Sequence, residues 1–200
     1  MTAPIPDPRV APAALKAELV ERARGGDHTA FAILAREAFG RMYGAAKLIL
    51  RDQHRAEDAV QDALIIAWRH VATIRDPDAW DAWLYRLTVR ACYRLARVRG
   101  TLDLGEVAVS ADPGSSVPDF TQSVADREQI MAALSSLPLE QRAVIVLHFY
   151  LDLPLTQVAA VLDVPAGTAK SRLHRGLERL RVSLGDDPER FASALRERPT

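Results

Sequence analysis

The sequence predicts an all-α protein made of two small helical domains joined by a flexible acidic linker, and three observations lead to that prediction. Apolar residues recur at helical spacing through most of the 200 residues, and no alternating apolar and polar run is long enough to indicate a sheet. A central stretch is punctuated by Gly, Pro, Ser and Asp and keeps no helical period, which is typical of a linker. Near the C-terminus, two short helical patterns flank a sharp turn, which indicates a helix-turn-helix.

These patterns divide the chain into five parts. Four prolines among the first twelve residues predict a disordered arm at 1–12. We expect one helical domain at 13–100, the linker at 101–125, the helix-turn-helix domain at 126–184 and a C-terminal tail at 185–200.

Charge is distributed unevenly along the chain. The 26 basic and 26 acidic side chains cancel, a balance that by itself argues against nucleic-acid binding. However, the first 100 residues carry 16 basic and 12 acidic side chains, whereas residues 101–125 carry four acids and no base. The segment from Leu84 to Arg99 contains five arginines and no acid. A neutral total therefore conceals two positive patches, one in each domain, separated by an acidic linker.

Several classes of protein are excluded by what the sequence lacks. No apolar run is long enough to span a bilayer, and the N-terminus has no apolar signal region, so we expect neither membrane insertion nor secretion. The single cysteine, Cys92, excludes an internal disulfide and a cysteine-built zinc site, and we expect it in the core. No phosphate-binding glycine loop, metal-spaced His/Cys cluster or nucleophile signature appears, so we expect no enzyme activity, catalytic residue, metal or cofactor.

A helix that begins near Arg55 combines a core face with a candidate partner face. Its apolar stripe, which includes Val60 and Leu64, has helical spacing and is expected to face the core. On another face, an aliphatic side chain lies among polar and charged ones: Asp58, Gln61, Asp62, Ile65 and Arg69. This mixture indicates a partner surface, although an ordinary solvated face with one stray isoleucine is the alternative.

A loop and an arginine-rich helix follow. Pro77 disfavours helix at the residue before it, so residues 72–81 are expected to form a loop. In the next helix, four arginines share one face: Arg86, Arg90, Arg94 and Arg97. This face suits DNA phosphates, whereas nothing in it supports the reading of base sequence.

The helix-turn-helix occupies residues 156–181. The first helix presents Val158, Ala159 and Leu162 on one face, and the second is expected to start between Ala166 and Thr168, after Pro165. The basic side chains of the second helix suit contact with phosphates: Lys170, Arg172 and Arg175. Two polar side chains, Ser171 and His174, suit contact with base edges. A solvated basic surface helix is the alternative.

Two separate sets of motifs carry a resemblance to a known family. The C-terminal set is the Leu-Pro opening at Leu137, with Arg142, and the run GTAKSRLHR from Gly167 to Arg175. The N-terminal set is RAEDAVQDALIIAW at 55–68 and WLYR at 83–86. Together they resemble the extracytoplasmic-function group of bacterial RNA polymerase sigma factors, of the sigma-70 family, over roughly residues 13–100 and 126–183.

The resemblance implies a function and a set of partners. It implies a bacterial cytoplasmic protein that binds core RNA polymerase, recognises the promoter minus-thirty-five and minus-ten elements and promotes melting, with an anti-sigma factor as a candidate further partner. The face from Asp58 to Arg69 would bind the polymerase, and a loop such as 72–81 would capture an extruded base of the non-template single strand. Trp80 is the candidate to line that pocket, with burial in the core as the alternative.

The C-terminal residues Lys170, Ser171, Arg172 and Arg175 match the family positions that contact double-stranded DNA of the minus-thirty-five element. Thr168 is expected to cap the helix and contact a phosphate, and His174 is a further candidate beside them. A different class of function, a helix-turn-helix transcriptional regulator that does not bind core polymerase, would leave the patterns at Asp58 to Arg69 and Arg86 to Arg97 unexplained.

The sequence also departs from the family pattern at several positions. Arg90 and Arg94 stand where many relatives carry Asn and Asp, and Asp163 stands where a turn glycine is usual. Pro154 and Ala169 replace a usual Ser and Val. Base-specific recognition by the arginine-rich helix is therefore not expected to carry over.

Overall fold

The computed structural model describes residues 10–102 and 121–184, and these form helices joined by short turns, with no strand among them. The predicted all-α class is confirmed. The helices extend into the predicted linker at both ends, since one ends at Leu102 and the next begins at Thr121. Helix passes Gly100 because glycine weakens a helix without stopping it. The four acids of the linker and the tail at 185–200 lie outside the described residues.

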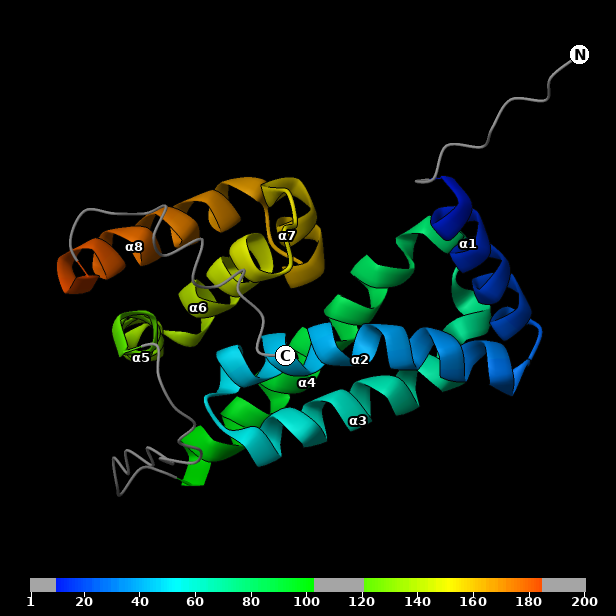
Figure 1. The fold of residues 1–200 in the computed structure, drawn as a ribbon, viewed down its shortest axis with the longest axis horizontal. Coiled ribbons are helices and arrows are strands. Elements are labelled where there is room, and N and C mark those ends of the chain that lie inside the picture. Colours follow the sequence, from blue (N-terminus) through cyan, green and yellow to red (C-terminus); the bar gives the residue numbers. More distant parts are fainter. Residues whose placement is uncertain (1–9, 103–120, 185–200) are drawn as a thin grey trace, which may run out of the picture.

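The N-terminal domain consists of four helices and two short 3₁₀ turns. They are α1 (Val10–Arg24), α2 (His28–Leu50), α3 (Gln53–His70), η1 (Val71–Thr73), η2 (Pro77–Ala79) and α4 (Trp80–Leu102). Helices α2, α3 and α4 pack against one another (Figure 1). Helix α1 packs on α2 and also contacts η1 and η2. Because α1 begins at Val10, the last residues of the predicted disordered arm are helical; Pro12 lies in the first turn, where its missing N–H is tolerated.

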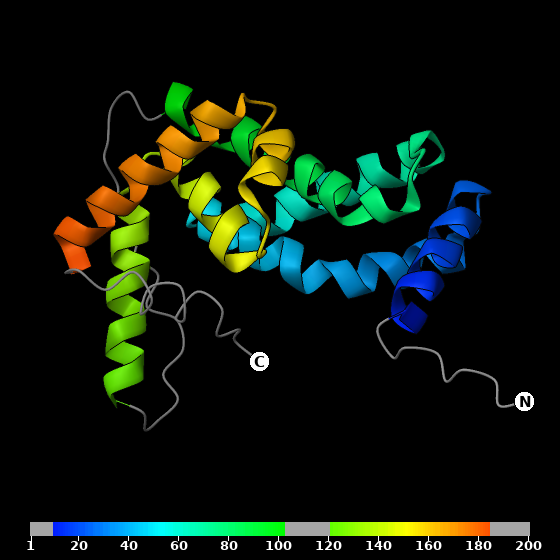
Figure 2. The ribbon, with the colours of Figure 1, turned by 90° about the horizontal axis from the view of Figure 1, so that it is seen from above.

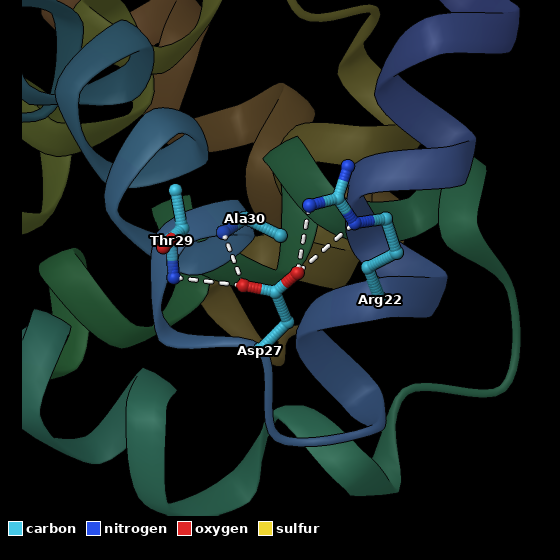
Figure 3. A network of polar contacts seen from close by, with 4 residues as sticks. All are labelled: Arg22, Asp27, Thr29 and Ala30. Carbon is cyan, nitrogen blue, oxygen red and sulfur yellow. Dashed lines mark hydrogen bonds and ion pairs between the residues drawn. The ribbon is translucent and has the colours of Figure 1, made fainter.

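Capping residues set where α2 begins and ends and where α3 begins. The Asp27 carboxylate accepts hydrogen bonds from the backbone N–H groups of Thr29 (2.9 Å) and Ala30 (3.0 Å), which starts α2 (Figure 3). Its other oxygen accepts from Arg22 of α1, so one side chain joins two helices. Arg51 ends α2 in the left-handed conformation at φ 62°, and Asp52 then caps α3. The two helices are therefore antiparallel neighbours.

The C-terminal domain contains α5 (Thr121–Ser136), α6 (Leu139–Ile145), a π-helical turn η3 (Val146–Tyr150), α7 (Leu155–Leu162) and α8 (Ala166–Leu184). Helix α8 packs on α6 and α7, as Figure 2 shows from above. Close approach to α6 is possible because Gly176 lies over Ile145: a Cβ at position 176 would be 2.7 Å from its Cδ1 atom.

The turn between α7 and α8 has the geometry of a helix-turn-helix. Asp163 adopts the left-handed conformation (φ 57°) and ends α7, while Val164 donates to the carbonyl of Ala159 (3.0 Å). Pro165 then precedes α8 and accepts from Thr168 and Ala169, at 2.9 and 3.1 Å. The predicted start of the second helix, at or just after Ala166, is confirmed.

Candidate polymerase and DNA interfaces

The predicted partner face of α3 is largely exposed to solvent. Asp58, Gln61 and Arg69 are exposed, and Ile65 is 50 % exposed, which is high for an isoleucine. The opposite side of α3 is buried and built largely from alanines, which let α2 and α4 approach closely. Half-exposed Asp62 accepts a hydrogen bond of 2.7 Å from Arg94 of α4. The face therefore remains accessible, but one of its acids is already paired.

Trp80 lies in the core of this arrangement, which is the alternative that its sequence position left open beside a place in a base pocket. The side chain is 1 % exposed and packs edge-on to Phe31, at 6.0 Å between ring centroids, and beside Trp83 at 5.7 Å. Its indole N–H is buried with no hydrogen-bond partner. The physical reason is that α2, through Phe31, and η2 pack against the start of α4. At 1 % exposure, the Trp80 ring offers no face on which a base could stack in this arrangement.

Trp68, a half-buried tryptophan near the end of α3, was not among the site residues predicted from the sequence. The ring of Trp68 lies 4.3 Å from that of His28, tilted by 34°, and 5.0 Å from that of Phe31, which it meets edge-on, measured between ring centroids. Trp68 shares helical spacing with Val60 and Leu64, which indicates core packing, and nothing in local spacing shows that the exposed His28 of α2 lies beside its ring.

The arginine face of α4 is mostly exposed, but two of its guanidinium groups face acids from other helices. Arg86 is half-buried, whereas Arg90, Arg94 and Arg97 are exposed. Arg94 pairs with Asp62 of α3, and Arg90 lies 3.7 Å from the Asp163 carboxylate in the helix-turn-helix. The sequence gives no sign of either pair, since both join residues far apart in the chain.

The predicted DNA-contacting residues of α8 lie in its first half, where Thr168, Ser171 and Arg172 are half-buried. Lys170, His174 and Arg175 are exposed, and Ser171 donates to the carbonyl of Thr168 (3.0 Å). Thr168 lies in the first turn of the helix, so the prediction that it caps the helix is wrong. The helix begins earlier because Pro165 supplies the carbonyl that the first turn needs.

Burial shifts the pKa values of three groups, Tyr93, Arg142 and Cys92. Burial raises the pKa of the Tyr93 hydroxyl to about 12, although the charge of Arg172 on α8 opposes the shift. Burial, with the charge of Arg51, lowers the pKa of Arg142 to about 10, so its guanidinium stays protonated at neutral pH. Cys92 is fully buried, as predicted, and burial raises its pKa to about 12. A charge from the other domain acts on each of Tyr93 and Arg142: Arg172 opposes the shift of Tyr93, and Arg51 adds to the shift of Arg142.

The described residues contain no group of His, Cys, Asp and Glu side chains that could hold a metal ion. None of the helices within 10–102 and 121–184 is both long and apolar enough to cross a membrane.

Comparison with known proteins matches each domain separately. The Sigma-70 region 2 family model matches residues 34–101, and the Sigma-70, region 4 model matches residues 127–180. The ECF RNA polymerase sigma factor SigM of Mycobacterium tuberculosis is 34 % identical over 172 residues, which cover 84 % of each chain. SigW of Bacillus subtilis is 29 % identical over 178 residues, covering 84 % of this chain and 95 % of its own. The sigma-E factor of Streptomyces coelicolor is 36 % identical over 140 residues, or 70 % of this chain and 77 % of its own.

Solved structures share the fold. CnrH in complex with the cytosolic domain of CnrY superimposes with a TM-score of 0.62 at 23 % identity, covering 84 % of this chain and 96 % of CnrH. The sigma factor RpoE of Bartonella quintana, in complex with the anti-sigma factor NepR, gives 0.59 at 26 % identity over 78 % of this chain and 94 % of its own. With both domains and their order matched, the chain belongs to the extracytoplasmic-function group of RNA polymerase sigma factors, in the sigma-70 family.

Proposed function

We propose that this sigma factor divides its work between three surfaces: the exposed face of α3 binds core RNA polymerase, the arginine face of α4 binds DNA of the minus-ten element, and the first half of α8 binds the minus-thirty-five element. The protein itself makes and breaks no covalent bond. It works in the bacterial cytoplasm, where polymerase and promoters are, and an anti-sigma factor is a candidate regulator because the solved relatives include one bound to such a protein.

The observation that carries the polymerase assignment is the composition of the α3 face. Ile65, half exposed, stands between the exposed polar side chains of Asp58, Gln61 and Arg69. An apolar centre with a polar rim is the usual anatomy of a protein interface. The match of the Sigma-70 region 2 model to residues 34–101 supports polymerase binding by this surface. It argues against the alternative, a regulator that acts without polymerase.

The DNA assignments rest on charge and exposure. On α8, the exposed side chains Lys170, His174 and Arg175 line the start of a helix that follows a helix-turn-helix turn, the part that enters a major groove. On α4, the arginines are proposed to contact phosphates and to fix register, not to read sequence. Arg90 and Arg94 must first exchange their present acidic partners for phosphate.

Co-purification with core polymerase, followed by run-off transcription from a promoter found by transcript mapping, tests the proposal. A sigma factor is expected to co-elute with core polymerase and to make transcription start at defined sites. DNA binding without any association with core polymerase would favour the regulator instead.

A further inference from the structure

One ion pair joins the two proposed binding faces of the N-terminal domain. Nη2 of Arg94 in α4 donates a 2.7 Å hydrogen bond to Oδ2 of Asp62 in α3. Asp62 belongs to the face proposed to bind polymerase, and Arg94 belongs to the face proposed to bind DNA. The two residues are 32 positions apart in the sequence, and they meet because α3 and α4 pack against one another (Figure 1).

Both members of this pair remain accessible to solvent. The side chain of Arg94 is 51 % exposed and that of Asp62 is 45 % exposed. Each can therefore be reached by an outside group while the two helices stay packed. An exposed pair of this kind favours the paired state by only about 1.5- to 5-fold. A ligand that binds either charge well can consequently replace the partner that the charge has in the free protein.

The pair keeps Arg94 from making a direct phosphate contact. Its hydrogen bond holds the guanidinium on the α3 side of α4. The carboxylate that lies against it carries the same sign of charge as a phosphate and would repel one that approached the same group. Affinity for DNA rises with the number of phosphates that Lys and Arg neutralise, because each such contact releases condensed counterions. The paired Arg94 is therefore not expected to add a contact of this kind.

This connection depends on a residue particular to the chain. Arg94 stands at one of the positions where the sequence departs from the family pattern, and relatives with Asn or Asp there would have no charge to pair with an acid at position 62. The link between the two faces is therefore a property of this chain and does not follow from its family.

We infer that Asp62 is a positioning residue for DNA contact: it holds the guanidinium of Arg94 in the free protein and releases it to a DNA phosphate when a basic group of core polymerase binds the Asp62 carboxylate. The first partner to bind must separate the pair, whereas the second binds a residue that is already free. By linkage, each partner raises the affinity for the other by about 1.5- to 5-fold. This role rests on the proposed function, in which α3 binds polymerase and α4 binds DNA.

A double-mutant cycle on the free full-length protein gives the first test. Binding to double-stranded DNA of random sequence is titrated at several NaCl concentrations without polymerase. In the wild-type background, Arg94→Gln should lower the affinity slightly, through loss of a long-range charge. In the Asp62→Asn background, it should lower the affinity by a further factor of about 1.5 to 5 and reduce the salt slope by about 0.9, because a direct phosphate contact is lost. Additive effects of the two substitutions would overturn the inference, since charges that act only at long range are additive.

Two further variants control this cycle. Glu57→Gln removes the same charge from α3 on the side that faces α2, where burial and then the charge of Glu57 raise the pKa of Tyr43. Its effect should simply add to that of Arg94→Gln. In the Asp62→Asn background, Arg94→Lys should keep the salt slope that Arg94→Gln loses, because lysine also neutralises a phosphate. A loss of slope with lysine as large as with glutamine would contradict a role based on charge.

Holoenzyme gives the second test, which asks whether polymerase releases Arg94. With core polymerase bound, Arg94→Gln should reduce the salt slope of DNA binding by about 0.9 even though Asp62 is present, as it does in the free Asp62→Asn protein. An effect as small as in the free wild-type background would overturn release by polymerase.

The failure of the proposed function gives different results. If Arg94→Gln has no effect in any background, Arg94 does not contact DNA, and the proposed role of the α4 face is wrong at this residue together with the inference. If Arg94→Gln weakens DNA binding equally in free protein and holoenzyme, the α4 face binds DNA as proposed and only its control by Asp62 is overturned.

Discussion

At the scale of single residues, Asp27 shows how one carboxylate can serve two purposes. It accepts two backbone hydrogen bonds at the start of α2 and forms an ion pair with Arg22 of α1 (Figure 3). These hydrogen bonds, the one from Ala30 first and that of Arg22 next, lower the pKa of Asp27 below its usual value of 3.8. The same side chain thus caps one helix and aligns another.

We predict that Asp27→Asn lowers the stability of the N-terminal domain at neutral pH while helix α2 is retained, because asparagine caps a helix about as well as aspartate but cannot pair with Arg22. Since the folded-state pKa is lowered, the advantage of wild type is present above the unfolded-state pKa of 3.8 and is lost as the pH falls through the folded value. Urea unfolding at pH 7 and pH 3 measures this difference. An equal difference at both pH values would mean that the ionised carboxylate is not responsible.

Arg175 is the residue for which DNA contact can be tested with the least interference from the fold. It is exposed on α8, whereas Arg172 is half-buried and its charge acts on Tyr93 of the other domain. We predict that Arg175→Ala weakens holoenzyme binding to promoter DNA by about 1–3 kcal/mol if the guanidinium reaches a base edge. If it reaches only a phosphate, all sequences should be bound more weakly and the salt slope should fall by about one.

Binding titrations over a range of salt concentrations distinguish these outcomes. Arg181→Ala is a matched control, because Arg181 lies further along α8 and pairs with Glu178 at 2.7 Å. If promoter-dependent transcription is the same for both variants and wild type, α8 is not the recognition helix.

At the scale of secondary-structure elements, the position of α8 is set by small residues on its buried side. Ala169 and Gly176 are buried, and Gly176 lies directly over Ile145 of α6. Arg179 reinforces the packing with a 3.1 Å hydrogen bond to Gln141. A bulky side chain at either small residue would lift the recognition helix from its support.

We predict that Gly176→Val destabilises the C-terminal domain by about 1–3 kcal/mol, because the added atoms would overlap a fully buried isoleucine. Ile145→Ala creates space at the same point. It should therefore lower the free energy of unfolding less in the Gly176→Val protein than in wild type. Urea denaturation of the four proteins gives the coupling. Strictly additive effects would contradict the proposed contact.

At the scale of the whole molecule, an ion pair connects two surfaces that lie far apart in the sequence. Asp62 of the proposed polymerase face pairs with Arg94 of the proposed DNA face. Replacement of Asp62 would therefore alter both surfaces. Asp58, which is exposed, is the better position at which to test polymerase binding.

We predict that Asp58→Lys weakens binding to core polymerase and leaves the helical circular-dichroism signal unchanged, because a charge reversal in an interface is costly whereas the same change at an exposed position is tolerated by the fold. Glu18→Lys, the same charge reversal at an exposed position of α1, is the control. Affinity is measured by competition for core polymerase. Equal affinity of the two variants would contradict the assignment of the α3 face.

The sequence by itself determined the helical class, the helix-turn-helix and the family, because these depend on local information. Periodic apolar residues such as Val158 and Leu162 define a buried face wherever the helix packs, and Pro165 sets the start of α8 through bonds to the next residues in the chain. The tertiary structure alone decided that Trp80 is covered, that Asp62 and Arg94 are paired, and that Gly44 receives Tyr150. Each of these depends on residues distant in sequence, and their meeting is set by how whole helix surfaces fit together, which local spacing does not encode.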